Sequence, residues 1–495
     1  MRTVRTIPGR TDRVVIIGAG LGGLSAALHL AGAGREVIVL EHDDEPGGRA
    51  GVLRDSGYTF DTGPTVLTMP SLLDDALGAV GESLDDWVTL RRLDPAYRAR
   101  FADGSALDVH ADPGAMADAI AAFCGPRDAD GYRRFVAFAR ELYRIELPHY
   151  IDRNLDSPRA LLGRPLLDLL RMGAFRRLAP KVASFMHDER LRRVFTFQAM
   201  YAGLAPAQAL AIYAVIPYLD CVAGVYFPLG GMHAVPRAMA DVAAKHGVAL
   251  RYGTRASRIE VSGGRARAVV TAAGERIPAD VVVVNADLPT ACGDLLPEEF
   301  APRRRLRYSP SCVVLHAGSR TPPRDAAHHT ISFGHAWHDT FDEIIRRGKV
   351  MSDPSFLLSA PSLTDPTLAP PGRHVCSALF PVPNLHHRTP IDWAAEAPRY
   401  QQHILDTLDA RGLGVDAQVL HLTTPADWQA RGLAAGTPFA AAHTFAQTGP
   451  FRAPTLDRRV ENLVRCGSNS QPGVGVPMVV VSGKLAAQRV TGATR

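Results

Sequence analysis

The segment Val14-Val-Ile-Ile-Gly18-Ala-Gly20-Leu-Gly22-Gly23 near the N-terminus decides the fold. Its first four residues form a short apolar run, as expected of a central parallel strand that is buried on both faces. The glycines that follow contain the pattern G-x-G-x-x-G at Gly18, Gly20 and Gly23. The next stretch, from Leu24, is rich in Ala and Leu and predicts a helix. Strand, glycine turn and helix together predict the first unit of a parallel α/β sheet.

A second strand and an acidic residue follow this unit. Glu36-Val-Ile-Val-Leu-Glu41 is apolar between its two carboxylates, and Glu41 stands 18 residues beyond Gly23. The glycines let the backbone approach a pyrophosphate, and the helix N-terminus offers it N–H groups and the positive end of the helix dipole. The carboxylate of Glu41 would accept hydrogen bonds from ribose hydroxyls. An ordinary glycine-rich turn does not need two flanking strands, a helix and a terminal carboxylate. Their combination therefore predicts a dinucleotide site at Gly18, Gly20, Gly22, Gly23 and Glu41.

The composition of the 495-residue chain excludes several classes of protein. Apolar residues make up 46% and charged residues 21%, which is ordinary for globular proteins and argues against disorder. The net charge of +5 is too small and too evenly spread to indicate a nucleic-acid partner. The six cysteines include no C-x-x-C pair, so we expect a reducing compartment and neither a disulfide framework nor a zinc site. The length predicts two or three domains.

No apolar stretch is long enough to predict a membrane-spanning helix, which needs about 20 such residues. The most apolar run, residues 209–227, is interrupted by Pro217 and Asp220. The short apolar run after the N-terminal arginines ends at Gly18, so no secretory signal is predicted. We therefore expect a cytoplasmic protein that is soluble or bound to a membrane surface.

Two motifs after Glu41 resemble those of a known flavoprotein family. Pro46-Gly47-Gly48-Arg49 resembles the extended flavin motif of the amine oxidase and carotenoid desaturase superfamily. Phe60-Asp61-Thr62-Gly63-Pro64-Thr65 resembles the F-D-x-G-P-T stretch of bacterial-type phytoene desaturases. The resemblance implies FAD as the cofactor, with Gly48 and Arg49 at its phosphates and with Gly63 and Pro64 also at the cofactor site.

The C-terminal end of the chain resembles the same family. Gln471-Pro472-Gly473-Val-Gly475-Val476-Pro477 matches a P-G-x-G-x-P loop that, in the family, lies beside the isoalloxazine ring. The family usually has His in place of Gln471 and Gly in place of Met478, which puts a role for a histidine at this position in doubt. The resemblance adds to the expected FAD contacts Gly467, Gly473, Gly475 and Val476, and Ala256 at the adenine.

The resemblance covers nearly the whole chain and implies an α/β fold with a Rossmann-like FAD-binding domain, as in the amine oxidase and glutathione reductase-like superfamily. We expect this domain to be discontinuous and to consist of residues 1–110, 225–304 and 452–495. Residues 111–224 would form a helix-rich region for substrate and membrane association. Residues 305–451 would form a substrate domain of sheet and helices.

The stretch 151–200 carries ten Lys and Arg against five Asp and Glu. A solvated helical face is one explanation. The other is a basic amphipathic surface that docks on anionic lipid, with Leu166, Leu169, Met172 and Phe175 entering the bilayer edge. A C40 hydrocarbon substrate has to be collected from lipid, so we expect an anionic membrane surface as a partner.

The reaction that the resemblance implies is the desaturation of a carotenoid. 15-cis-Phytoene would be oxidised stepwise to neurosporene or lycopene, with a hydride passing to flavin N5 and a proton to a nearby base. Quinone or oxygen would be the final electron acceptor. Asp156 and Arg159 resemble an acid–arginine pair proposed near the flavin in this family, with Asp156 as the base. A helix cap before Pro158 is the alternative role of Asp156.

Other functions share the cofactor motifs. One alternative is the oxidation of another carotenoid, of a modified C40 or a C30 type. A less favoured alternative is amine oxidation. An amine oxidase generally frames its substrate nitrogen with a pair of aromatic residues near the flavin, and the C-terminal segment offers no such pair, since Phe445 and Phe451 are the nearest aromatic residues before Gly473. A flavin-free binding protein of the GDP-dissociation-inhibitor kind is disfavoured because the chain keeps Gly23 and Glu41. We expect no metal, since no carboxylate or cysteine completes a ligand set with the histidines at 328, 329, 335 and 338.

Overall fold

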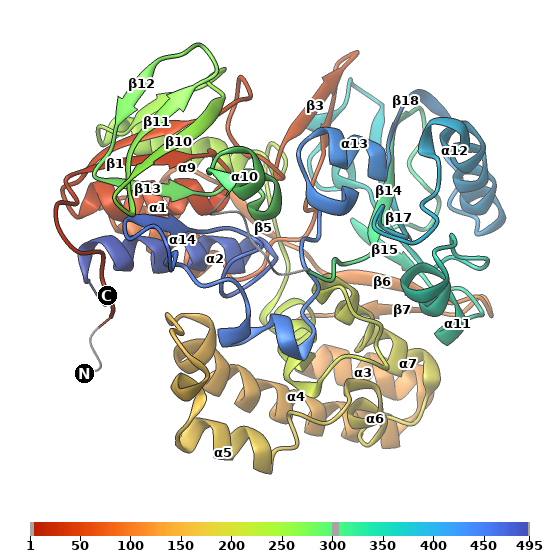
Figure 1. Ribbon diagram of the computed structural model, residues 1–495. Helices are drawn as coiled ribbons and strands as arrows, with labels where there is room; N and C mark the ends of the chain where they lie inside the picture. The colour runs from red at the N-terminus through yellow and green to blue at the C-terminus, as the bar shows by residue number, and fades with distance from the viewer. Residues whose placement is uncertain (1–3, 299–305, 494–495) are drawn as a thin grey trace.

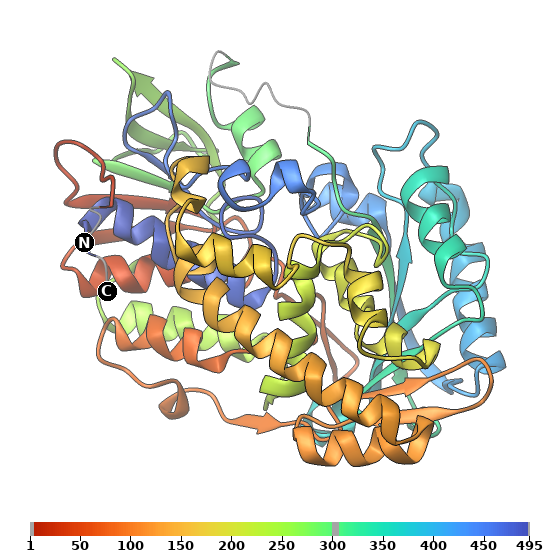
Figure 2. The same cartoon turned by 90° about the horizontal axis from the view of Figure 1, so that it is seen from below.

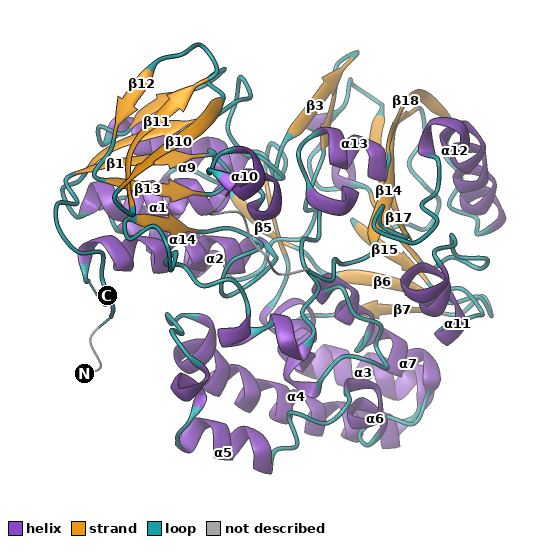
Figure 3. Ribbon diagram, in the orientation of Figure 1, coloured by secondary structure: helices purple, strands orange, loops and turns teal. Residues whose placement is uncertain are grey.

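Figure 1 shows the computed structural model, which describes residues 4–298 and 306–493. A parallel sheet with its helices lies on the left of this view and a larger, mostly antiparallel sheet on the right. Figure 3 shows that the third part of the molecule, below the two sheets, is almost entirely helical. The expected α/β fold with a helix-rich region is therefore present.

The first sheet has five parallel strands, and both of its faces are covered. Val14 and Ile16 pack against helices, whereas Val15 and Ile17 pack against a small antiparallel sheet on the other side. This double burial explains why the strand is apolar at every position. The strands in spatial order are β19 (Leu463–Arg465), β13 (Val281–Val284), β1 (Arg13–Ile17), β2 (Glu36–Leu40) and β9 (Ala249–Arg251).

The elements that cover this sheet come from distant parts of the chain. The helices on one face are α1 (Leu21–Gly32), α2 (Pro70–Gly78), α9 (Ala234–Lys245) and α14 (Val476–Thr491). The antiparallel sheet on the other face consists of β10 (Ala256–Ser262), β11 (Arg265–Thr271) and β12 (Arg276–Pro278). Helix α14 packs along α1, so the two ends of the chain meet in this part of the fold.

The second sheet has seven strands and carries α12 (Trp393–Ala410) on one face. Its strands in spatial order are β18 (Ala417–Thr423), β14 (Ser311–Ser319), β17 (His374–Val382), β16 (Phe356–Ser359), β15 (His329–Ser332), β6 (Tyr97–Arg100) and β7 (Ala106–Val109). Strand β6 runs parallel to β15, with Thr330 opposite Arg98. Residues 97–109 thus belong to this sheet, which differs from the expected boundary at residue 110, because short strands carry no sequence signal for their pairing partners.

The helical part lies below both sheets, and in the view from below it stands in front of them (Figure 2). Its helices are α3 (Pro113–Cys124), α4 (Pro126–Glu146), α5 (Arg164–Arg171), α6 (Leu178–Ala183), α7 (Glu189–Val194) and α8 (Val215–Tyr218). Two π-helical turns, residues 147–151 and 219–223, follow α4 and α8 directly. None of the described helices is both long and apolar enough to cross a bilayer.

Shorter elements connect these parts. They are β3 (Val52–Asp55), β4 (Tyr58–Asp61), β5 (Leu90–Arg92), β8 (Tyr226–Pro228), α10 (Leu288–Asp294), α11 (His338–Asp342) and α13 (Pro425–Ala430). Strands β5 and β8 pair, and β8 leads into the Gly230-Gly231 turn before α9. The chain thereby returns from the helical part into the parallel sheet.

Candidate functional site

A cavity of about 1320 Å³ runs from the carboxyl end of the parallel sheet into the helical part. Ligands of doubly wound sheets bind at this edge. Twelve of the fourteen residues predicted to contact the cofactor line it: Gly18, Gly20, Gly22, Glu41, Gly48, Arg49, Gly63, Pro64, Ala256, Gly467, Gly475 and Val476. The structure thus gathers motifs from both ends of the chain around one space.

Two helix N-termini open onto the polar end of the cavity. Gly20 precedes α1 and Gly475 precedes α14, and both line the cavity without a capping side chain. Unpaired N–H groups and the positive end of the helix dipole therefore face it from two sides. This arrangement suits a ligand with negatively charged groups.

The two predicted contacts that do not line the cavity have packing roles. A Cβ atom on Gly23 would lie 2.1 Å from the carbonyl oxygen of Gly18, so this glycine allows α1 to approach β1. A Cβ atom on Gly473 would lie 2.2 Å from the imidazole of His443. A side chain on either glycine would displace the loop that carries it.

Glu41 lies at the end of β2, with its side chain held by three hydrogen bonds. Its Oε2 accepts from the N–H of Ala19 at 2.7 Å, and its Oε1 accepts from the N–H of Asp43 at 3.1 Å and from His42 at 2.8 Å. Burial raises the pKa of Glu41, but the hydrogen bonds from His42 and the backbone outweigh it, so the net pKa is lowered. The carboxylate is therefore charged and held in a fixed orientation at the wall of the cavity.

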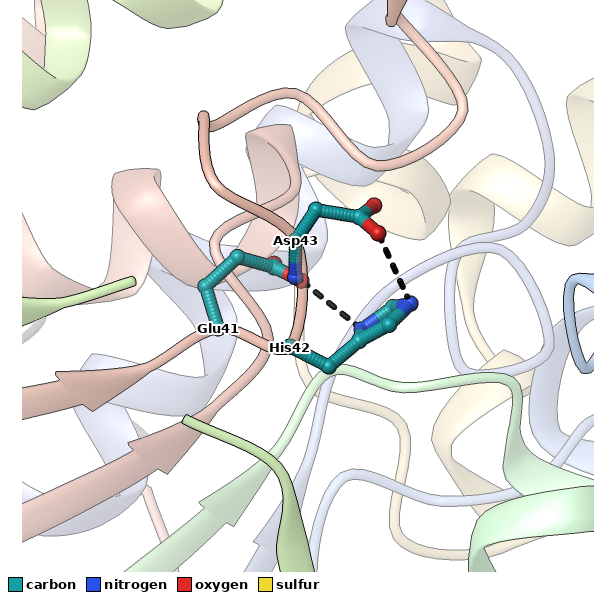
Figure 4. Close-up of side chains that lie close together, drawn as sticks. All are labelled: Glu41, His42 and Asp43. Carbon is teal, nitrogen blue, oxygen red and sulfur yellow. Dashed lines mark hydrogen bonds and ion pairs between the residues drawn. The ribbon is translucent and has the colours of Figure 1, made fainter. Parts of the chain in front are cut away.

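Figure 4 shows how His42 bridges two carboxylates. Its ring nitrogens lie 2.8 Å from Glu41 and 3.2 Å from Asp43. The three side chains are close enough together to hold a metal ion. The hydrogen bonds account for the cluster without an ion, and the one to Glu41 raises the pKa of His42.

Arg49 is part of a polar cluster that sequence reasoning only partly identified. Its guanidinium contacts Asp287 at 2.5 Å and donates to the hydroxyl of Ser468 at 3.1 Å. Asn469 donates to the same Asp287 oxygen at 3.1 Å. Burial raises the pKa of Asp287, and the positive charge of Arg49 opposes this. The available signal for Asp287 was its position directly after the apolar run that forms β13.

Two buried polar atoms at this end of the cavity, Arg49 Nε and Thr62 Oγ1, have no hydrogen-bond partner among the described residues. Buried polar atoms are almost always hydrogen-bonded, so a polar ligand is expected to complete them. The pattern of donors, helix termini and closely packed glycines fits the diphosphate and ribityl parts of FAD. The residues that would hold it are Glu41, Arg49 and the two N-terminal turns.

Asp61 anchors the F-D-x-G-P-T motif to the turn that follows Gly230 and Gly231. The carboxylate of Asp61 accepts from the N–H groups of Met232 at 2.8 Å and His233 at 3.2 Å. Burial raises the pKa of Asp61 to about 6. A Cβ atom on Gly63 would lie 1.7 Å from the carbonyl oxygen of Arg49, so this turn packs directly on the flavin motif.

The predicted catalytic pair is not assembled. Asp156 forms an ion pair with Arg489 of α14, and neither Asp156 nor the exposed Arg159 lines the cavity. The alternative of a helix cap also differs from the structure, because Ser157 precedes the short helix and no side chain caps it. Asp156 instead joins the helical part to α14, since the buried guanidinium needs an anion.

The far end of the cavity is mostly apolar. Leu166, Leu169 and Phe175, which were expected to enter a membrane, line it instead. Helical periodicity explains the difference, because residues 166 and 169 lie on one stripe of α5 and the exposed Leu167 and Leu170 lie on the adjacent one. Tyr213 and His443 lie between this end and the C-terminal loop, and the Tyr213 hydroxyl donates to the His443 carbonyl at 2.8 Å.

Two carboxyl groups, Glu146 and Asp220, interrupt the apolar lining. Neither was singled out as a functional residue from the sequence, although Asp220 was visible as the acidic break in the most apolar run. Gln471, which stands where a histidine is usual, forms two hydrogen bonds with the backbone of Leu155. Its role is therefore to hold the C-terminal loop against the helical part.

Comparison with known proteins agrees with this site. The model of the family "Flavin containing amine oxidoreductase" matches residues 21–491. A phytoene dehydrogenase of Streptomyces griseus is 54% identical over 491 residues, covering 98% of this chain and 96% of that one. A zeta-carotene-forming phytoene desaturase of Myxococcus xanthus is 37% identical over 487 residues, with 97% and 93% covered.

A solved oxidoreductase structure from Methanosarcina mazei has the same fold, with a TM-score of 0.62, 17% identity, and 95% of this chain and 99% of that chain covered. At this identity the likeness concerns the fold alone. The family model and the relatives in sequence carry the assignment. The chain therefore belongs to the flavin-containing amine oxidoreductases and, among them, to the bacterial-type phytoene desaturases, which makes it an FAD-dependent oxidoreductase.

Proposed function

We propose that this protein is an FAD-dependent phytoene desaturase that oxidises 15-cis-phytoene stepwise to neurosporene or lycopene. The observation that carries the proposal is the continuity of the cavity, which joins the cofactor loops to an apolar space without a break. A hydrocarbon offers no group for hydrogen bonding, so its recognition depends on shape and apolar contact. The relatives' names support the same substrate.

The residues of the apolar end would position the substrate. Side chains such as Leu166, Phe175 and Ile216 exclude water and hold the polyene near the C-terminal loop, which brings the reacting carbons to the cofactor. When bound, the flavin supplies the acceptor for two electrons and one hydrogen. Quinone or oxygen would then remove the electrons.

The substrate would enter from a membrane surface through the side of α5. Leu162, Leu167 and Leu170 are 66%, 52% and 53% exposed, respectively, and lie beside the exposed Arg164 and Arg171. Exposed leucines flanked by arginines suit a surface helix on anionic lipid. Because the neighbouring Leu166 and Leu169 line the cavity, α5 would lie between the lipid and the substrate site.

The test is incubation of the purified protein with FAD and liposomes that contain 15-cis-phytoene, followed by separation and visible absorption of the pigments. Coloured products with the bands of neurosporene or lycopene would support the proposal. Colourless phytoene together with demonstrably bound flavin would overturn it. Modified C40 and C30 carotenoids, and then amines, are the substrates to try next in that case.

A further inference from the structure

Asp220 lies in the apolar end of the cavity, where no acidic residue is needed to bind a hydrocarbon. Its side chain is on the π-helical turn 219–223, and the residue is only 2% exposed. π-Turns inside helical segments occur frequently at functional sites. The hydroxyl of Tyr97 donates a hydrogen bond to the carboxylate at 3.1 Å and fixes its orientation.

The surroundings of Asp220 are connected to both cofactor loops. The Tyr97 ring packs on His329 at 5.6 Å, and the His329 ring contacts the carbonyl of Thr65 in the F-D-x-G-P-T motif at 3.0 Å. On the other side, the His443 N–H donates to the carbonyl of Ala202 at 2.9 Å. The N–H of Val474 in the C-terminal loop donates to the His443 ring at 3.4 Å. Asp220 is therefore tied through Tyr97 and His329 to the Thr65 loop. It also lines the same cavity as His443, which contacts the C-terminal loop.

The other titratable groups around Asp220 stay neutral near pH 7. Burial raises the pKa of Tyr97 from β6, of Tyr201 from the turn 197–202 and of the adjacent Cys221. Burial lowers the pKa of His329, behind Tyr97, to about 4. Burial also raises the pKa of Asp220, to about 7, against the hydrogen bond from Tyr97. Asp220 is thus the group of this set that exchanges a proton in the neutral range.

Glu146 is the competing carboxyl group of the apolar end. It stands at the C-terminus of α4, is 8% exposed, and its Oε1 has no hydrogen-bond partner. Burial without a compensating contact raises its pKa well above the ordinary value. Asp220 differs from Glu146 in its geometry, because the Tyr97 hydroxyl orients the Asp220 carboxylate whereas no hydrogen bond from the described residues orients Oε1 of Glu146.

We propose that Asp220 is the catalytic residue that accepts the substrate proton in each desaturation, and that Tyr97 is its positioning residue. One C–H bond breaks with departure of a hydride, which reduces the bound flavin by two electrons. The C–H bond on the neighbouring carbon breaks heterolytically, its electron pair forms the new C=C bond, and an O–H bond forms on Asp220. The proton is later released to water. This inference depends on the proposed desaturase function.

The experiment compares Asp220→Asn, Tyr97→Phe and Glu146→Gln with the wild type and with Asp130→Asn, an exposed site on α4. Initial rates are measured on phytoene liposomes between pH 5.5 and 8.5, at saturating FAD. Asp220→Asn should lower kcat by about 100-fold or more, the usual scale of general-base catalysis, with an unchanged flavin spectrum and flavin affinity. The wild-type kcat should rise with pH and level off above about 7, which is the titration of Asp220.

Two further readouts distinguish catalysis from a structural effect. Tyr97→Phe removes a hydrogen bond that favours the carboxylate, so the rise in kcat should move to higher pH. The infrared carboxylic-acid C=O band of the flavin-loaded protein should contain a component that titrates near neutral pH in the wild type and is missing in Asp220→Asn. Asp130→Asn should match the wild type in every measurement.

The possible results distinguish the role of Asp220 from the desaturase function itself. An Asp220→Asn variant that turns over at the wild-type rate, or a missing infrared component in the wild type, would overturn the assignment and leave the desaturase function intact. Loss of turnover in Glu146→Gln with retention in Asp220→Asn would move the role to Glu146. A wild type that binds flavin but converts no phytoene would overturn the proposed function, and the assignment of Asp220 with it.

Discussion

Arg489 and Asp156 form a two-pronged ion pair, with Nη2 2.6 Å from Oδ1 and Nη1 3.2 Å from Oδ2. The guanidinium is completely buried, whereas 47% of the carboxylate side chain is exposed. The pair joins the helical part to α14, whose N-terminus opens onto the cavity. Its position predicts a structural role in orienting that helix.

Asp156→Asn should therefore lower stability rather than turnover. It leaves a buried guanidinium without its anion, and a charge-assisted hydrogen bond of this kind contributes about 2 kcal/mol. We expect the free energy of unfolding, measured with urea on the flavin-loaded protein, to fall by about that amount. Turnover of the folded enzyme should stay within a few-fold of the wild type. Arg159→Gln, an exposed neighbour, is the control. A large loss of turnover with unchanged stability would restore Asp156 as a candidate base.

Replacing Glu41 should weaken FAD binding. Glu41→Gln keeps the size of the side chain but removes the charge that would receive the ribose hydroxyls, a loss of about 2 kcal/mol, or roughly 30-fold in affinity. The measurement is quenching of FAD fluorescence on titration of the protein without cofactor. The control is Asp85→Asn, because Asp85 is exposed and does not line the cavity. Equal affinities for Glu41→Gln and the wild type would contradict the assignment of Glu41.

The contact of α1 with α14 depends on Gly22. A Cβ atom there would lie 2.7 Å from the Asn285 side chain and 3.1 Å from the carbonyl of Val479. Gly22→Ala should therefore push the two helix N-termini apart, cost about 1–3 kcal/mol of stability and reduce the flavin content. Gly78→Ala, at the end of α2 with open space around its Cβ, should change neither. Purified holoenzyme with a full flavin content in Gly22→Ala would contradict this account.

The cofactor half of the site could be predicted from the sequence because local patterns determine it. Gly18, Glu41 and Gly475 lie at strand ends and helix starts, which the order of apolar runs and glycines indicates directly. The sequence could not distinguish glycines that line the cavity from glycines that let two backbone segments pack together, since both kinds of position exclude a side chain. Gly23 and Gly473 were therefore predicted as contacts together with the other glycines, although neither lines the cavity.

The substrate half could not be predicted in the same way, because its residues come together only through tertiary packing. The proximity of Asp156 and Arg159 in sequence suggested a pair, yet the partner of Asp156 is Arg489, 333 residues away. Tyr97 meets Asp220 across 123 residues, and its strand β6 enters the second sheet beside β15, which lies far away in the sequence. An acidic residue within an apolar run, such as Asp220, indicates that the acid is buried, but the sequence does not indicate which side chains surround it.

The exposed face of α5 should be required for binding to anionic membranes. Leu167→Glu with Leu170→Glu replaces two exposed apolar side chains by charges, and each leucine is worth about 1.5 kcal/mol or more when buried in lipid. Cosedimentation with vesicles containing anionic lipid should fall by well over tenfold. Binding of the wild type should also weaken with added salt, because arginines contribute. Leu363→Glu, also an exposed leucine at 42%, is the control. Undiminished cosedimentation of the double variant would exclude α5 as the docking element.

The stability of the protein should fall as the pH drops from 6.5 to 4, in part through His316. This histidine is buried in β14 with Nδ1 2.8 Å from the Ser377 hydroxyl, and burial lowers its pKa to about 4. Between the ordinary value of 6.5 and about 4, the unfolded chain binds a proton at this residue and the folded chain does not, so acid favours unfolding. The contribution amounts to about 1 kcal/mol between pH 7 and pH 5.5.

His316→Gln should reduce the difference in unfolding free energy between pH 7 and pH 5.5 by about that 1 kcal/mol, measured by urea unfolding at both values. The exposed His338, replaced by Gln, should leave the difference unchanged. Part of the pH dependence should persist in His316→Gln, because burial also lowers the pKa of His29 and of His329 to about 4. If His316→Gln showed the full wild-type difference, His316 would have to be protonated inside the fold, and the sheet around it would have to admit water or an anion.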